Sequence, residues 1–414
     1  MQKKIIALAI AGLASSGAFA QSNVTVSGNI GASYNQYTLS GATAARTTYK
    51  QNMVSDESSA IILKGEEALG NGLTAWFQID SRLTMDRGNG ATNNYNQPYT
   101  ASGLGNGNTA IGLKGNFGTV GIGRWDIHYD TFSAIGEVVT AGALAARIGY
   151  FGVMAQVNGA QVALGTRAAN VMFYDTPTFN GFKGRIGYST AAAGGEGEGF
   201  LAAANGDPGS GSAYQVKLNY DNGPIAVVYS YFNHKVEDRG NYTACATAST
   251  GLALTCPPTA TAAGAINPTD QKSSRLGASY TFPMGLRVGL GWDRSTMTSN
   301  VAALGDRTRT AWMLPVSYTM GNHTFHGTYA KAGNTSGVAA NANGSTDTSA
   351  KEWMLAYGYN FTKRTSMGVQ YITLRTGDNA ASTLAGASAG NTGLTANAVG
   401  EDAKLWSFNV RHFF

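Results

Sequence analysis

The connections between the predicted strands alternate between tight turns and long polar loops, a pattern that few folds allow. Tight turns are predicted at 70–72, 116–118, 177–181, 221–224, 283–285, 320–322 and 361–363. Long connections rich in Gly, Ala, Asn, Ser and Thr are predicted at about 86–107, 125–166, 190–212, 235–272, 295–306, 332–349 and 377–402. Transmembrane β-barrels have short turns at one rim and longer loops at the other. The alternation therefore predicts a chain that crosses a membrane with strands.

The segments between these connections have a polarity that repeats every two residues. In the first of them, Val24, Val26 and Ile30 share one face, whereas Thr25 and Ser27 share the other. The last segment, 405–414, alternates in the same way and ends in His-Phe-Phe. Successive side chains of a strand point to opposite faces, so each strand is predicted to have one dry and one wet face.

About sixteen such segments can be counted along the 414 residues. Barrels of this kind usually have an even number of strands, and closure leaves no unpaired backbone in lipid. Sixteen strands also enclose an aqueous channel. The predicted fold class is therefore all-β, a 16-stranded antiparallel transmembrane β-barrel.

Residues 1–20 are predicted to be a cleaved signal peptide, which leaves 21–414 as the barrel. Lys3 and Lys4 precede a nine-residue apolar run, 5–13, and Ala18-Phe19-Ala20 is a small-x-small cleavage site. The alternative, a membrane anchor, requires about twenty apolar residues. Cleavage removes two lysines and lowers the formal net charge from +5 to +3.

The two cysteines, Cys245 and Cys256, lie in one Thr/Ala/Pro-rich loop. In an exported protein an even cysteine count suggests a disulfide, which here would close a short loop. The alternative is two free thiols.

The stretch 125–166 interrupts the strand pattern. It is mildly apolar, rich in Ala and Gly, and lies between Arg124 and Arg167. A structureless loop of this length would count against a compact domain. If the strands close into a wide barrel, the loop can instead fold into the lumen and narrow it.

Several chemistries are missing from the sequence. It has no basic block of the kind that tracks nucleic acid, no phosphate-binding G-x-x-x-x-G-K and no H-E-x-x-H. Its one G-x-S-x-G match, at 386–390, lies in a predicted long loop and not at the strand-to-helix elbow that a nucleophile needs. His323 and His326 are predicted to point to opposite faces of a strand, so they cannot share a metal. We therefore expect no cofactor and no catalytic site. The alternatives are a secreted or surface adhesin, which would need a polar exterior, and a barrel with enzymatic activity, which would need a nucleophile and a base.

Four segments resemble the general porins of Gram-negative outer membranes, most closely the beta-proteobacterial type. They are SSAIILKGEEALGNGLTAWFQID at 58–80, FGTVGIGRW at 117–125, RAANVMFYDTPTFNGFKGRIGY at 167–188 and NVRHFF at 409–414. The resemblance implies a homotrimer of barrels in the outer membrane, surrounded by lipid and lipopolysaccharide. It also implies passive diffusion of small hydrophilic solutes and ions, and an inward-folded third loop that forms the constriction.

The same resemblance implies that wall arginines face acidic groups on the loop. Arg124 and Arg167 match two of the wall arginines, and Glu137 is the candidate loop acid. A third expected arginine is replaced by Ala60. The basic residues on the predicted wet faces that are candidates to compensate are Lys64, Arg82, Lys183 and Arg185.

Strand parity conflicts with two of these assignments. Counting from Val120 and Ile122 places Arg124 on the lipid face, and counting from Val171 and Phe173 does the same for Arg167. A charge on that face costs about 2–4 kcal/mol at mid-bilayer. We expect a bulge or a strand end to turn both arginines inward; the alternative is a pair of rim arginines. The surplus of inward cations predicts a weak-to-moderate anion preference.

Overall fold

The computed structural model describes residues 23–41, 48–57, 59–83, 85, 104–126, 128, 153–154, 156–157, 160–161, 167–190, 212–235, 269–299, 306–341, 343–380 and 399–414. The predictions for the signal segment 1–20, for Glu137 and for Cys245 and Cys256 lie outside these ranges. Within them, no helix is long and apolar enough to cross a membrane.

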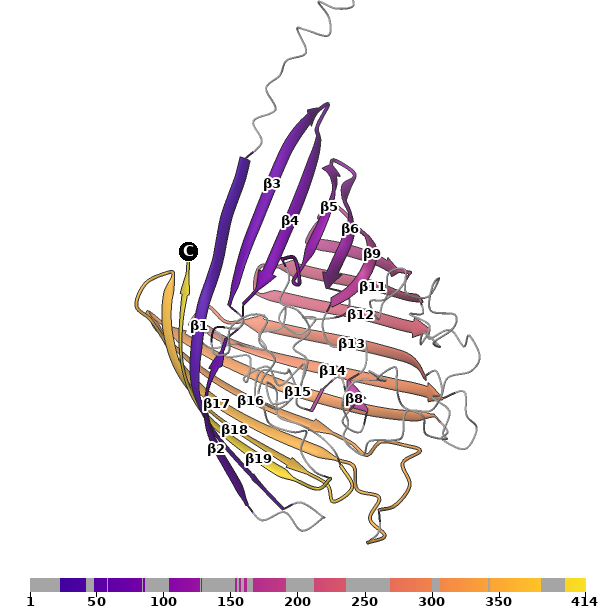
Figure 1. The fold of residues 1–414 in the computed structure, drawn as a ribbon, viewed down its shortest axis with the longest axis vertical. Coiled ribbons are helices and arrows are strands. Elements are labelled where there is room, and N and C mark those ends of the chain that lie inside the picture. Colours follow the sequence, from indigo (N-terminus) through magenta and orange to yellow (C-terminus); the bar gives the residue numbers. More distant parts are fainter. Residues whose placement is uncertain are drawn as a thin grey trace, which may run out of the picture.

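The described chain consists of strands joined by turns and loops (Figure 1). The strands are β1 (Asn23–Ser40), β2 (Tyr49–Asp56), β3 (Ala60–Gly70), β4 (Leu73–Arg82), β5 (Thr109–Gly115), β6 (Gly118–Asp126), β7 (Gln156–Val157), β8 (Ala160–Gln161), β9 (Arg167–Asp175), β10 (Phe182–Ser189), β11 (Ser212–Asn222), β12 (Ile225–Lys235), β13 (Thr269–Thr281), β14 (Leu286–Ser299), β15 (Arg307–Met320), β16 (His323–Ala332), β17 (Ala350–Asn360), β18 (Thr365–Thr376) and β19 (Asp402–Phe413). β7 and β8 form a separate small sheet.

The remaining strands form one closed antiparallel barrel, which confirms the predicted fold class. β2 and β3 pair with successive halves of β1, so they are one strand interrupted at 57–59 and the barrel has sixteen strands. The first and last strands join, with Tyr34 opposite Phe408 and Ser40 opposite Asp402. Figure 1 shows the indigo β1 beside the yellow β19.

A polar network holds the interruption in the second strand. The Ser59 hydroxyl accepts a hydrogen bond from the Gly31 N–H at 3.0 Å, and the Ser59 N–H donates to Asp56 at 3.0 Å. Arg411, on β19, donates to the Glu57 carbonyl at 3.1 Å. Because the three segments meet at the closure, these contacts satisfy backbone groups that the ladder leaves unpaired.

The outer and inner faces differ as the period-two pattern predicts. Large apolar side chains on one face of each strand are exposed, for example Val26, Leu290, Trp353 and Trp406, and polar side chains such as Asn35 are buried on the other face. Aromatic pairs lie near both rims, for example Tyr371 with Trp406 and Tyr359 with Phe361. This apolar exterior does not match the polar exterior that the adhesin alternative required.

The assignment of Val171 and Phe173 to the lipid face is wrong. Both side chains point inward, and their exposed fractions are 0% and 5%. The register between β6 and β9 shifts between Gly123 and Trp125, and Asn170 has a positive φ of 53°. The bulge reverses the parity only of the residues that precede Asn170, whereas Val171 and Phe173 pair regularly with Gly123 and Gly121. These two side chains are apolar because they pack in a buried cluster inside the barrel, which counting along the sequence could not include.

Candidate functional site

The inner face of the barrel carries more cations than anions. Cross-strand pairing places eleven basic strand residues of the described chain on this face, namely Lys64, Arg82, Lys114, Lys183, Arg185, Lys217, Arg275, Arg287, Arg307, Arg309 and Arg411. Six acidic residues share it, namely Glu66, Asp80, Asp175, Asp221, Asp293 and Glu352. The inner wall is therefore net positive over its described strands.

Arg82 occupies the position beside the missing wall arginine. Ala60 lies directly opposite Arg82 across β3 and β4, so both face the same part of the lumen. An Asp80 carboxylate oxygen accepts a hydrogen bond from Arg82 at 2.7 Å. Asp80 also accepts a hydrogen bond from the Asn108 N–H at 3.2 Å, so the segment that follows the long connection 86–107 covers this pair. The placement supports Arg82 as the compensating cation.

Arg185 and Lys183 share one carboxylate. Arg185 binds both oxygens of Asp175, at 2.5 and 2.7 Å, and Lys183 lies 3.9 Å from it. The Arg185 guanidinium also lies 4.8 Å from the centre of the Phe173 ring, which stacks on Trp125. The arginine is thus held rigidly on the wall, whereas the Lys183 side chain is half exposed.

Lys64 and Lys114 extend the positive wall toward the short turns. Lys114 forms an ion pair with Glu66 at 2.5 Å. Lys64 is exposed and lies opposite Thr25 and Gln78. Its inward orientation agrees with the sequence prediction.

The other wall holds cations that the sequence prediction did not single out. Arg275 is buried and donates to Asp293 at 2.9 Å, while Ser273 and Ser295 donate to the same carboxylate. Arg307 and Arg309 follow on β15 with the same parity. Alternation along 269–320 contained the signal for these residues, because Arg275 directly precedes the outer Leu276, and Arg307 and Arg309 lie an odd number of positions before the outer Trp312.

Described residues of the long loop contact the inner wall. The His128 ring nitrogen Nδ1 lies 2.8 Å from the Ser230 hydroxyl, and its ring stacks on Phe232. Arg275 donates to the His128 carbonyl at 2.7 Å. These contacts anchor the start of the loop to β12 and β13, inside the barrel.

A second contact of the loop is apolar. Val153 and Met154 are fully buried in a cluster with inner-wall residues of seven strands. The wall members are Tyr37, Leu39, Val228, Ala311, Met313, Ala330, Ala332, Ala350, Met354, Ile372, Leu374, Ala403 and Leu405. An apolar patch on a wall that otherwise faces water is explained by this docking, since burial removes it from water.

The anchor at His128 makes loop docking sensitive to pH. Burial, together with the nearby charges of Arg275 and Lys217, lowers the pKa of His128 well below its ordinary value of 6.5. The docked loop therefore holds a neutral ring, and a released loop binds a proton more readily. The contribution of the neutral His128 ring to docking is fully present above about pH 6.5, and it falls by at most about 1.4 kcal/mol per pH unit below that.

We expect current fluctuations of single channels to increase as the pH falls from 7.5 to 4.5. His128→Gln keeps a polar partner for Ser230 but does not titrate, so its fluctuations should change far less. An equal response in the variant would show that another group titrates.

The two remaining predicted wall residues are Arg124 and Arg167. Arg124 lies opposite Thr109, on the face shared by the lipid-facing Ile111 and Ile122. Its Nε donates to the Asn106 carbonyl at 3.2 Å, at the strand end. The backbone of Arg167 pairs with Asp126, and its side chain lies outside the described part of the chain. The geometry therefore brings together Lys64, Arg82, Lys183 and Arg185 on one wall and leaves Arg124 at the rim.

A closed barrel with an apolar exterior, a charged interior and a loop docked inside defines a transmembrane channel. A family model described as "Gram-negative porin" matches residues 7–382. Outer membrane porin protein 32 of Delftia acidovorans is 30% identical over 298 residues, which are 70% of this chain and 69% of that protein. Major outer membrane protein P.IB of Neisseria lactamica is 28% identical over 232 residues, covering 56% of this chain and 58% of that protein.

The chain belongs to the Gram-negative porin family, and it is an outer-membrane diffusion channel. The family and the fold are those of a channel rather than of an enzyme. A solved structure described as an anion-selective porin from Comamonas acidovorans has a TM-score of 0.64 at 23% identity and covers 95% of this chain and 100% of that one. At that identity the likeness shows the fold alone.

Proposed function

We propose that the channel conducts small hydrophilic solutes and ions with a weak-to-moderate preference for anions. The observation that supports this is the inner wall, whose described strands carry eleven cations and six anions. Fixed positive charge along a narrow aqueous path raises the local concentration of anions and lowers their barrier. The relative from Comamonas acidovorans is described as anion-selective, which agrees in direction.

Reversal potential tests this proposal most directly. Purified protein in a planar bilayer, with a tenfold KCl gradient, should give a potential whose sign corresponds to chloride permeation. A potential of the cation sign would overturn the anion preference.

We propose further that the loop over 125–166 forms the constriction and that Arg167 and Glu137 lie beside it, whereas Arg124 stays at the rim. The support is the docking of His128, Val153 and Met154 on the inner wall. Arg167→Glu is expected to move the selectivity toward cations without unfolding the barrel. Unchanged selectivity in a protein that still resists detergent would remove Arg167 from the constriction.

The assembly and the processing of the chain are also proposals. We infer a homotrimer set in outer-membrane lipid and lipopolysaccharide, exported with cleavage after Ala20; a related fold, the OmpT protein of Vibrio cholerae, is described in a trimer form. Gel mobility before and after boiling should show a heat-labile oligomer of three chains, and a protein that migrates as a monomer without heating would contradict it. Intact mass would locate the cleavage site and show whether Cys245 and Cys256 form a disulfide.

A further inference from the structure

A recess lies in the inner wall at the end of the barrel that carries the tight turns. Its volume is about 430 Å³, and its lining includes the lysines Lys114 and Lys183 and the threonines Thr74, Thr119 and Thr178. We call it the turn-side recess. Cavities that bind small molecules have volumes of about 300–1,000 Å³. The recess is therefore large enough for a small solute.

Three neighbouring strands form the floor of the recess. Thr74 on β4 lies directly opposite Lys114 on β5, and Lys114 lies directly opposite Thr119 on β6. Residues directly opposite each other share a face of the sheet, and Lys114 belongs to the inner wall. The recess therefore opens on the water-filled lumen.

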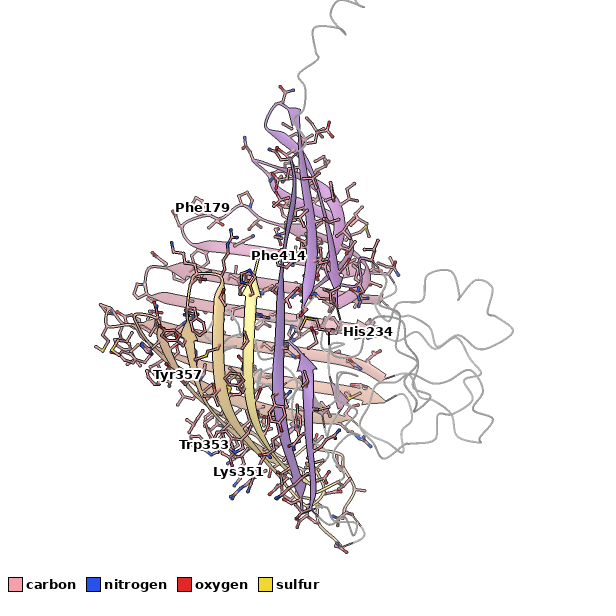
Figure 2. The ribbon with its side chains drawn as sticks, turned by 60° about the vertical axis from the view of Figure 1, so that its left-hand side comes forward. Phe179, His234, Lys351, Trp353, Tyr357 and Phe414 are labelled. Atoms are coloured by element: carbon pink, nitrogen blue, oxygen red, sulfur yellow. The ribbon has the colours of Figure 1, made fainter. Side chains whose placement is uncertain are left out.

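The turn between β9 and β10 forms one side of the recess and carries Thr178. Figure 2 shows this turn, marked by Phe179, at the ends of β9 and β10. The Thr176 hydroxyl accepts a hydrogen bond from the Gly184 N–H at 2.8 Å, which holds the turn against β10. This side of the recess is therefore fixed before any solute binds, which lowers the entropy cost of binding.

The charge beside the recess is positive. Lys114 pairs with Glu66 at 2.5 Å, whereas Lys183 lies 3.9 Å from Asp175, whose two oxygens already accept hydrogen bonds from Arg185. Three cations thus share two carboxylates. Both lysines line the recess, neither carboxylate does, and both ammonium groups are partly exposed. An anionic group in the recess can therefore contact two cations.

The threonines add hydrogen-bonding capacity that the protein does not use. Among the described residues, no side-chain hydrogen bond joins the hydroxyl of Thr74, Thr119 or Thr178 to another group. Each hydroxyl can donate one hydrogen bond and accept two. Such groups match the hydroxyl groups of a solute, whereas the lysines match the oxygens of a phosphate or carboxylate group.

We propose that the turn-side recess binds a small hydroxylated anion. Lys114 and Lys183 contact its phosphate or carboxylate group, and the three threonines contact its hydroxyl groups. Short turns face the periplasm in barrels of this kind, so the solute is held at the periplasmic mouth of the channel. This inference rests on the proposed conduction of small anions, and it places a binding site apart from the constriction.

The test compares a double variant with a matched control. Lys114→Gln with Lys183→Gln removes both cations of the recess. Arg287→Gln with Arg307→Gln removes two cations of the inner wall that do not line the recess. Both variants lose the same charge from the lumen, so both should lose part of the anion preference. Only the first should lose the binding site.

Binding is measured by calorimetric titration of glucose 6-phosphate, and separately of gluconate, into the folded protein in detergent at low salt. We expect saturable binding with one site per chain. Loss of two charge-assisted contacts should weaken it roughly a hundredfold in the recess variant, whereas the control should stay within a few-fold of the natural protein. Binding of either compound supports the proposal, and the stronger of the two identifies the charged group as phosphate or carboxylate.

Equal losses in the two variants would overturn the proposal, because binding would then follow the total charge of the wall. Absence of saturable binding to the natural protein would also overturn it. If the reversal potential keeps the anion sign in that case, the recess is not a site but the channel proposal stands. A reversal potential of the cation sign would instead overturn the proposed anion preference.

The role of the hydroxyl groups is tested separately. Inorganic phosphate and glucose should each bind the natural protein more weakly than glucose 6-phosphate does, because each has only one of the two kinds of group. Thr74→Val with Thr119→Val keeps the shape of both side chains and suits a strand. This variant should bind glucose 6-phosphate no better than inorganic phosphate. An undiminished preference for glucose 6-phosphate in this variant would contradict the role of these threonines.

Discussion

Arg185→Gln is expected to shift the reversal potential toward cations, and Asp175→Asn is expected to shift it toward anions. The two residues form a bidentate ion pair on one wall. The first change leaves the carboxylate without its main partner, and the second leaves Arg185 and Lys183 without theirs. For an ion about 6 Å away in screened water, one wall charge changes the ratio of anion to cation permeation by about threefold.

The measurement is the reversal potential in a KCl gradient, repeated at low and high salt. The effect should decrease as the salt concentration rises, because the Debye length falls from about 10 Å at 0.1 M to about 3 Å at 1 M. Lys272→Gln removes a cation from the outer face and should leave the potential unchanged. Shifts of the same sign in both wall variants would show that lost structure, rather than wall charge, controls selectivity.

Met154→Asp is expected to release the long loop from the inner wall and to raise single-channel conductance severalfold. Met154 has an exposed fraction of 0% within the apolar wall cluster. Burying a carboxylate there costs several kcal/mol without a partner, so the loop is more stable when it leaves the wall. The strand ladders do not involve Met154, and the barrel should keep its resistance to heat in detergent.

Met154→Leu is the control, since it keeps an apolar group of similar volume and should conduct like the natural protein. Entry of larger sugars into liposomes gives a second measurement, because a released loop should raise the size limit of the channel. If the folded Met154→Asp protein has the same single-channel conductance as the natural protein, this contact does not position the loop.

The barrel was predictable because a sheet between lipid and water imposes a strict period of two. The tight turns and the inward positions of Lys64, Arg82, Lys183 and Arg185 follow directly from that period. The period also held for His323 and His326, which the structure places on opposite faces. One residue inserted beside any of these positions would have reversed its face, and around each of them the cross-strand register is regular.

The errors occur where the count changes or where the inner face is apolar. Val171 and Phe173 point inward although their composition suits lipid, because they pack in an apolar cluster inside the barrel. Asn170 adds a residue to β9 and reverses the parity of the residues before it. The second strand is interrupted at 57–59, where side chains replace the ladder hydrogen bonds. The apolar patch on the inner wall was also missed, because a sequence does not show that part of a water-filled lumen is covered by a loop.

Closure of the barrel joins its first strand to its last strand. Gly28 and Phe414 exchange backbone hydrogen bonds at 3.2 and 3.1 Å, although 386 positions separate them. Contacts this distant are slow to form, and until they form β1 and β19 each remain an open edge that can recruit other chains. We therefore expect a newly exported chain to depend on a chaperone that binds it until β1 and β19 pair. The chain should aggregate when more of it is exported than the chaperone can bind.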